Sequence, residues 1–181
     1  MLKTTRGLGF YGVEYPGYAL CGGGFPTEET ILWGAARALQ HLREALGVAP
    51  EDTVAFGQSI GGAVALQMTR RKHCGACVLL SSFASLPAMC REVFPFVPAP
   101  EKLVKDPFDC VDAAPDVDAP VLCLHGTRDE IVPYAQGVAV SKLLPRATLV
   151  SLRGAGHNDT FNGAAFRRVL DALDDFLKRL A

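Results

Sequence analysis

Three residues of the sequence have the types and order of a nucleophile, an acid and a base. Ser59 lies in Gly57-Gln58-Ser59-Ile60-Gly61, a G-x-S-x-G pattern, in which a strained turn between a strand and a helix exposes the serine hydroxyl. Asp129 and His157 follow along the chain in that order. An imidazole activates a serine by removing its proton, and a carboxylate fixes the imidazole tautomer and stabilises the imidazolium. The three types together predict nucleophilic catalysis on an acyl bond.

Other residues compete for the acid and base roles. Glu130, next to Asp129, is the alternative acid, and Asp159 is a weaker one that is close to His157 in sequence. The remaining histidines fit the base role less well, because they are expected on a helix, at a helix end and inside a strand end: His41, His73 and His125. We therefore predict Ser59 as nucleophile, Asp129 as acid and His157 as base.

The elements around these residues follow an alternating pattern. Short apolar runs predict strands at residues 8–14, 53–56, 76–81, 121–125 and 148–152. Apolar periodicity predicts helices, the first of them N-capped by Thr27, at residues 28–46, 63 to about 72, 134–144 and 166–180. Strands that alternate with helices indicate a parallel α/β sheet, and functional groups gather at the carboxyl ends of such strands. Each of the three candidate residues follows a predicted strand.

The chain is expected to form a single domain over residues 1–181, with a small cap-like segment at about 83–119. This segment is rich in proline and aromatic residues and is predicted to lack regular structure. Within it, Phe94-Pro95-Phe96-Val97-Pro98 cannot continue a helix, because proline removes a donor and biases the preceding residue to extended geometry. We interpret the segment as a cap or pocket wall; the alternative is a surface excursion packed by its own aromatic residues.

Composition excludes several classes of protein. A net charge of −1 and a pI near 6.4 do not indicate the excess of basic residues that is typical of nucleic-acid-binding proteins. No apolar run approaches the roughly 20 residues of a membrane helix, and the N-terminal residues lack the apolar core of a signal peptide. These features predict one soluble domain in a reducing, cytoplasmic setting.

Neither a cofactor nor a metal is expected. The six cysteines are too sparse for a disulfide scaffold. The C-x-x-C at Cys74 and Cys77 suggests redox chemistry or half of a zinc site, but no second pair accompanies it, so buried small residues are favoured. Gly22-Gly23-Gly24 lacks the following Lys-Ser/Thr of a nucleotide loop.

Five blocks of the sequence carry a family resemblance. They are Glu14-Tyr15-Pro16-Gly17-Tyr18, Gly57-Gln58-Ser59-Ile60-Gly61-Gly62-Ala63-Val64, Phe94-Pro95-Phe96, His125-Gly126-Thr127-Arg128-Asp129-Glu130-Ile131-Val132-Pro133 and Gly156-His157-Asn158-Asp159. Together they resemble the α/β-hydrolase family, and specifically the branch with the Bem-type membrane-anchored and the protein-depalmitoylating hydrolases. The blocks extend over nearly the whole chain, and the last two are the most specific.

The resemblance implies a metal-independent serine hydrolase that acts through an acyl-enzyme. It assigns Ser59, Asp129 and His157 to the triad and the backbone N–H of Ile60 to half of the oxyanion hole. The expected reaction is cleavage of an ester or thioester in a small molecule or an acylated protein. The alternatives are a serine peptidase of the prolyl-oligopeptidase clan and a non-catalytic module that binds a partner.

The sequence departs from the family at its N-terminus. Members of the family normally carry three further strands, a helix and a His-Gly-type loop before the strand that corresponds to residues 8–14, and that loop supplies the second oxyanion donor. The third of those strands lies between the strand at 8–14 and the elbow strand. We therefore expect an N-terminally truncated α/β-hydrolase fold, favoured over completion by a second chain or a degenerate protein. Membrane association is expected only through upstream sequence.

Overall fold

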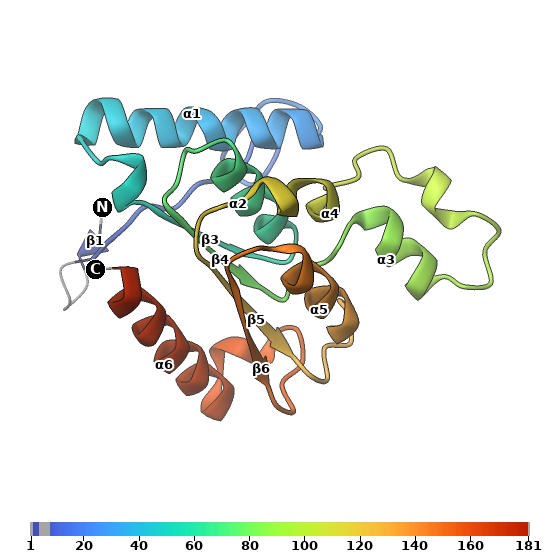
Figure 1. The fold of residues 1–181 in the computed structure, drawn as a ribbon. Coiled ribbons are helices and arrows are strands. Elements are labelled where there is room, and N and C mark those ends of the chain that lie inside the picture. Colours follow the sequence, from blue (N-terminus) through green and yellow to red (C-terminus); the bar gives the residue numbers. More distant parts are fainter. Residues whose placement is uncertain (1, 4–7, 181) are drawn as a thin grey trace. The chain divides into compact units, whose positions relative to one another are not determined.

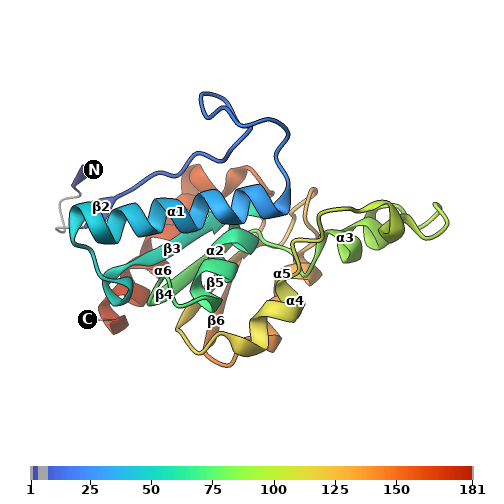
Figure 2. The same cartoon turned by 90° about the horizontal axis from the view of Figure 1, so that it is seen from above.

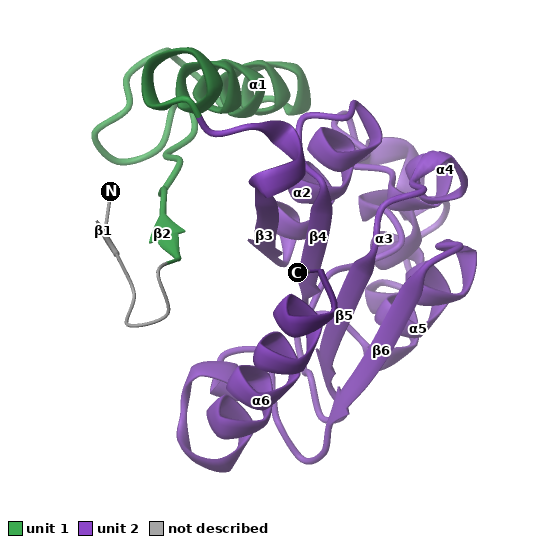
Figure 3. Cartoon of the chain, turned by 60° about the vertical axis from the view of Figure 1, so that its left-hand side comes forward, with its two compact units in different colours: residues 1–47 green, residues 48–181 purple. Residues whose placement is uncertain are grey.

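A computed structural model describes residues 2–3 and 8–180 of the protein, and the chain divides into two units, Met1–Gly47 and Val48–Ala181 (Figure 3). The predicted domain of residues 1–181 thus includes residues 1, 4–7 and 181, which lie outside the described residues. Because the positions of the two units relative to one another are not determined, each is described by itself.

The first unit contains one long helix, α1 (Glu28–Leu46), with the predicted ends. At its start, the Thr27 side chain accepts a hydrogen bond from the N–H of Thr30 (3.2 Å), and the Thr30 hydroxyl accepts one from the N–H of Thr27 (2.9 Å). These reciprocal bonds satisfy donors that an N-terminus otherwise leaves without partners. At its end, Gly47 adopts a left-handed conformation (φ 67°), which glycine accepts without a Cβ clash.

The prediction of a strand at residues 8–14 is mostly wrong. Only β2 (Gly9–Phe10) forms, and it pairs antiparallel with β1 (Leu2–Lys3) in a two-stranded ribbon. Among the described residues, 11–14 have no ladder partner. A β-strand is defined by its hydrogen bonds to a neighbouring strand. An apolar run without such a neighbour therefore does not continue the strand.

The second unit is built on a sheet of four parallel strands (Figure 1). These are β3 (Val54–Gln58), β4 (Ala76–Leu80), β5 (Val121–Gly126) and β6 (Ala147–Leu152), adjacent in that order. All residues of β4 and β5 are buried, whereas β3 and β6 are partly exposed. Burial on both faces is typical of central parallel strands. The prediction of a mostly parallel sheet flanked by helices is confirmed.

Helices cover both faces of this sheet (Figures 1 and 3). On one face lie α2 (Ile60–Arg70), which packs on β3 and β4, and α5 (Tyr134–Leu143), which packs on β5 and β6. On the other face, Val169 and Phe176 of α6 (Gly163–Leu180) join the apolar core of β4 and β5. The sheet is therefore a rigid support for the loops at its ends.

The segment between β4 and β5 is more regular than predicted. It contains α3 (Leu86–Val93), the 3₁₀ turns η2 (Pro100–Leu103) and η3 (Ala114–Asp116), and α4 (Cys110–Ala113). Ser85 caps α3 by accepting a hydrogen bond from Ala88 N (3.2 Å), and Pro87 lies in the first turn, where a missing N–H costs nothing. The helix ends at Val93, ahead of Pro95, so the proposed break is confirmed.

Candidate active site

Ser59 lies on a strained turn between β3 and α2. Its backbone has φ 54° and ψ −121°, a conformation that costs a non-glycine residue about 1–3 kcal/mol. The turn is also tight, because a Cβ added at Gly57 would lie 1.9 Å from Gly61 O, and one at Gly62 would lie 2.6 Å from Ser82 Oγ. This is the geometry that the G-x-S-x-G pattern predicts.

Neighbouring groups hold the turn in place. Ser59 N donates to Leu80 O at the end of β4 (2.9 Å), and Ser82 Oγ donates to Ser59 O (3.2 Å). Ile60, predicted as an oxyanion donor, is the first residue of α2. A first-turn N–H has no acceptor within its own helix, and the positive end of the helix dipole favours a negative charge there. Ile60 N–H is therefore suited to bind an oxyanion.

The structure brings the predicted acid and base together. Asp129 Oδ2 lies 2.8 Å from His157 Nδ1, and the Asp129 side chain is fully buried. Asp129 Oδ1 accepts hydrogen bonds from Ile131 N (3.0 Å) and Val132 N (2.7 Å). An ionised carboxylate only accepts, so His157 Nδ1 carries the proton and Nε2 is left as the basic nitrogen.

The loop that carries His157 contacts the elbow strand. Gln58, the last residue of β3, donates from Nε2 to His157 O (3.2 Å). The alternative acids bind backbone rather than the imidazole: Glu130 Oε2 accepts from His157 N (3.3 Å), and Asp159 Oδ2 accepts from Gly156 N (3.0 Å). Glu130 and Asp159 therefore hold the backbone of the loop that carries His157, whereas Asp129 orients its imidazole. The sequence pattern did not predict this role, nor the contacts of Gln58 and Ser82.

A second histidine lies beside the acid. His125 is buried; its Nε2 is 2.9 Å from Val132 O and 3.5 Å from Asp129 Oδ2. Burial, the largest cause, and the nearby His157 lower the pKa of His125, although Val132 O and Asp129 oppose this. His125 is thus a neutral donor that braces the 126–132 turn. Its signal in the sequence is one polar residue in an otherwise apolar strand.

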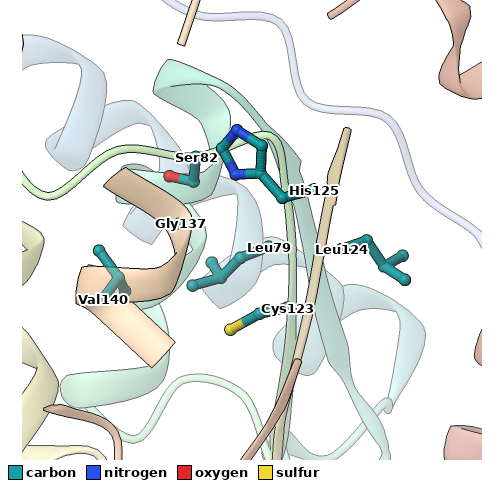
Figure 4. A pocket seen from close by; sticks show the side chains of 7 residues that line it. All are labelled: Leu79, Ser82, Cys123, Leu124, His125, Gly137 and Val140. Atoms are coloured by element: carbon teal, nitrogen blue, oxygen red, sulfur yellow. The ribbon is translucent and has the colours of Figure 1, made fainter. Parts of the chain in front are cut away.

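A small cavity lies under His125, between β4, β5 and α5 (Figure 4). It is lined by Leu79, Ser82, Cys123, Leu124, His125, Gly137 and Val140, and its volume is about 10 Å³. That is close to the space of one water molecule. The cavity is therefore a packing gap beside the site, too small to hold a substrate.

The two cysteines of the C-x-x-C, Cys74 and Cys77, are buried core residues. Burial raises the pKa of Cys74 to about 12 and that of Cys77 well above its usual value. Since the thiolate is the reactive species, these surroundings disfavour redox chemistry at the C-x-x-C. Within residues 2–3 and 8–180, no three His, Cys, Asp or Glu side chains cluster to hold a metal ion. None of the helices described is both long and apolar enough to cross a bilayer.

Comparisons with known proteins agree with this architecture. A family profile described as TAP-like protein, of the α/β-hydrolase class, matches residues 81–179. The chain is 32% identical over 177 residues to alpha/beta hydrolase domain-containing protein 17C of Mus musculus, which covers 97% of this chain and 52% of that protein. It is 30% identical to alpha/beta hydrolase domain-containing protein aho-3 of Caenorhabditis elegans, over 98% of this chain and 53% of that protein. The chain thus spans about half the length of these relatives.

A solved structure shares the fold. The esterase RhEst1 of Rhodococcus sp. ECU1013 superposes with a TM-score of 0.70, covering 93% of this chain and 79% of the esterase at 17% sequence identity. At this identity the likeness concerns the arrangement of strands and helices. It matches the parallel sheet and flanking helices described above.

Proposed function

We propose that this chain, which belongs to the TAP-like family of α/β hydrolases, is a serine hydrolase that cleaves ester or thioester acyl bonds. One observation carries the proposal: the buried 2.8 Å contact between His157 Nδ1 and Asp129 Oδ2 joins the loops after β5 and β6, and Gln58, next to Ser59, bonds the backbone of His157. The acid, the base and a strained serine thus occur at the carboxyl end of one sheet. Substrates would be small-molecule esters or acylated proteins.

The first half of the reaction forms an acyl-enzyme. Ser59 Oγ attacks the carbonyl carbon while His157 Nε2 takes the hydroxyl proton, and Asp129 stabilises the resulting imidazolium. The carbonyl oxygen becomes an oxyanion that Ile60 N–H binds. His157 then gives its proton to the departing alcohol or thiol as the bond to the acyl carbon breaks.

The second half restores the enzyme. A water molecule attacks the acyl-enzyme while His157 Nε2 takes its proton, and Ser59 Oγ leaves with that proton as the acid product forms. Asp129 keeps the same imidazole orientation in both halves, because its other oxygen is fixed by two backbone N–H groups. A single acid–base pair therefore serves both steps.

Hydrolysis of p-nitrophenyl butyrate, an acyl thioester and a short peptide amide tests this proposal. Ser59→Ala is expected to lower kcat by about 10⁴-fold or more, because the nucleophile acts as a unit with its base. Ser141→Ala is the matched control, since Ser141 lies on α5 and its hydroxyl donates to Val138 O within the same helix (2.9 Å). A Ser59→Ala variant within tenfold of the parent would contradict the nucleophile. Faster turnover of the peptide amide would contradict the assigned bond class.

A further inference from the structure

The first turn of α5 carries a buried glutamine whose side-chain bonds reach other parts of the chain. Gln136 is 7% exposed. Its Oε1 accepts a hydrogen bond from Ala84 N (3.1 Å), and its Nε2 donates to the carboxylate of Glu92 on α3. A buried amide is costly unless its polar atoms have partners. Bonds at both ends of the amide give Gln136 one orientation, and they fix Ala84 and Glu92 relative to α5.

Ala84 is the point where the two legs of the segment between β4 and β5 meet. Its N–H donates to Gln136, and its carbonyl accepts from the first two N–H groups of α4 (2.8 and 3.2 Å). Ala84 is buried, so its N–H depends on the glutamine for an acceptor. Figures 1 and 2 both show α3 projecting from the second unit beside α5. Gln136 therefore anchors the root of this projecting segment.

Two serines connect Ala84 to the nucleophile turn. Ser82 Oγ donates to Ser59 O (3.2 Å). Ser81 is fully buried, its N–H donates to Leu124 O (2.8 Å), and its backbone is left-handed (φ 47°). A non-glycine residue keeps such a conformation only where its surroundings impose it. The bond that holds Ser59 thus lies in a strained link whose far end, Ala84, is fixed by α5.

The same turn of α5 also supports the acid. A Cβ at Gly137 would lie 2.1 Å from His125 Nδ1, and Figure 4 shows the two residues side by side. The ring of Tyr134 packs edge-on against that of His125, with centroids 5.7 Å apart. His125 Nε2 in turn lies 3.5 Å from Asp129 Oδ2. The first turn of α5 therefore contacts the supports of both the acid and the Ser59 turn.

We propose that Gln136 is a positioning residue, which sets the nucleophile turn relative to the acid by fixing Ala84 to α5. This role rests on the proposed function, since it belongs to that reaction. A carboxylate only accepts, so Glu92 selects the amide orientation in which Oε1 faces Ala84 N. An acid in the last turn of α3 is also disfavoured by the helix dipole, and the donor from Gln136 offsets this cost.

Gln136→Met tests the role, because methionine has a similar length but lacks both polar groups. Ala84 N then loses its acceptor, and the Ser59 turn is expected to shift. For p-nitrophenyl butyrate, kcat is expected to fall by about 10²-fold, which is the effect of a misplacement of about 1 Å. KM is expected to stay within about threefold of the parent. Activity is expressed per site titrated by a fluorophosphonate, so that unfolded chain does not contribute to kcat.

Two further measurements separate positioning from a loss of stability. The acid limb of kcat/KM against pH reports the catalytic base, and it is expected at the parent pH in Gln136→Met, because the contact of Asp129 with His157 is kept. Gln136→Glu keeps an acceptor for Ala84 N but sets a carboxylate against Glu92, so kcat is expected to fall. Adding Glu92→Gln restores a donor between the two side chains, and kcat is expected to return to within about threefold of the parent.

Gln67→Met is the matched control. Gln67 on α2 is also partly buried and donates through Nε2 to Asp109 O (3.4 Å), on the second leg of the same segment. Its kcat is expected to equal that of the parent, and a loss as large as that of Gln136→Met would contradict the specific role of Gln136.

Two other results would overturn the proposal. One is a Gln136→Met chain with the parent kcat per titrated site. The other is a double variant, Gln136→Glu/Glu92→Gln, that is no more active than Gln136→Glu. Either result in a labelled, active parent would remove the positioning role alone. A folded parent that takes no label on Ser59 would instead overturn the proposed function together with this role.

Discussion

Replacing Asp129 by asparagine isolates the electrostatic role of the acid from its shape. Asp129 Oδ1 accepts from two backbone N–H groups, of Ile131 and Val132. An amide NH₂ at that position would face two donors, so the asparagine oxygen is expected to remain there. The NH₂ group must then replace Oδ2, which lies 2.8 Å from His157 Nδ1. Since NH₂ only donates, His157 Nδ1 must become an acceptor.

This exchange reverses the tautomer of His157. With Nδ1 accepting, the ring proton moves to Nε2, which can no longer take a proton from Ser59. The expected loss in kcat is about 10⁴-fold, or about 5 kcal/mol of transition-state stabilisation. The free energy of unfolding is expected to change much less, because the two bonds to Oδ1 remain.

Glu130→Gln and Asp159→Asn are the matched controls. Both carboxylates accept from backbone N–H groups, at 3.3 Å and 3.0 Å, and an amide oxygen preserves that bond. Their kcat on p-nitrophenyl butyrate is expected to stay within about tenfold of the parent. The reasoning is refuted if Asp129→Asn retains a tenth of the activity, or if Glu130→Gln shows the 10⁴-fold loss instead.

Three further predictions concern the surroundings of the site and the core of the sheet. A Cβ at Gly137 would lie 2.1 Å from His125 Nδ1, so Gly137→Ala is expected to displace the His125 ring and lower kcat. The control Ala139→Gly on the same helix is expected to leave kcat unchanged. Equal activity of the two variants in the ester assay would contradict the role of His125 in bracing the turn. His125 lies beside Asp129, His157 and Tyr134, and its pKa is lowered in the folded chain. As the pH falls below about 6.5, the imidazole of residue 125 therefore takes up a proton in the unfolded chain before it does so in the folded chain. The stability that neutral His125 contributes is present above that pH and is lost as the pH falls toward the folded pKa. The urea midpoint is therefore expected to fall less steeply with decreasing pH in His125→Gln than in the parent. Identical slopes for the two chains would refute this. Leu122→Ala, at a fully buried position of β5, is expected to reduce the free energy of unfolding by about 2–5 kcal/mol, against little change for the exposed Leu103→Ala in the same denaturation experiment.

The elements with strong local signals were predictable from the sequence. Thr27 and Gly47 bound α1 because cap chemistry is local. The strand before Ser59 and the helix after it were identified because both are apolar runs around a glycine-rich turn. The spacing of Asp129 and His157 after their strands predicted the pair that the structure joins, since parallel strands bring their carboxyl ends to one edge.

Features that depend on distant partners were not predictable. Residues 11–14 resemble a strand in composition, but a strand also needs a neighbour. The helix α3 was not predicted because the prolines of the segment 83–119 indicate irregular structure, although Pro87, the one proline within the helix, falls in a permitted first turn. The contacts of Glu130, Asp159 and Gln58 with the His157 loop are long-range hydrogen bonds. Types and spacing alone do not show whether a carboxylate meets an imidazole or a backbone N–H.

The most direct test of the central claim is covalent labelling by a fluorophosphonate, which bonds to an activated serine oxygen as fluoride leaves. The folded chain is expected to gain one label, located on Ser59 by peptide mass mapping. Ser59→Ala is expected to remain unlabelled, and Asp129→Asn to label far more slowly, because His157 no longer accepts the serine proton. A folded parent chain that takes no label, or that takes it on another serine, would contradict the assignment of Ser59 as the nucleophile.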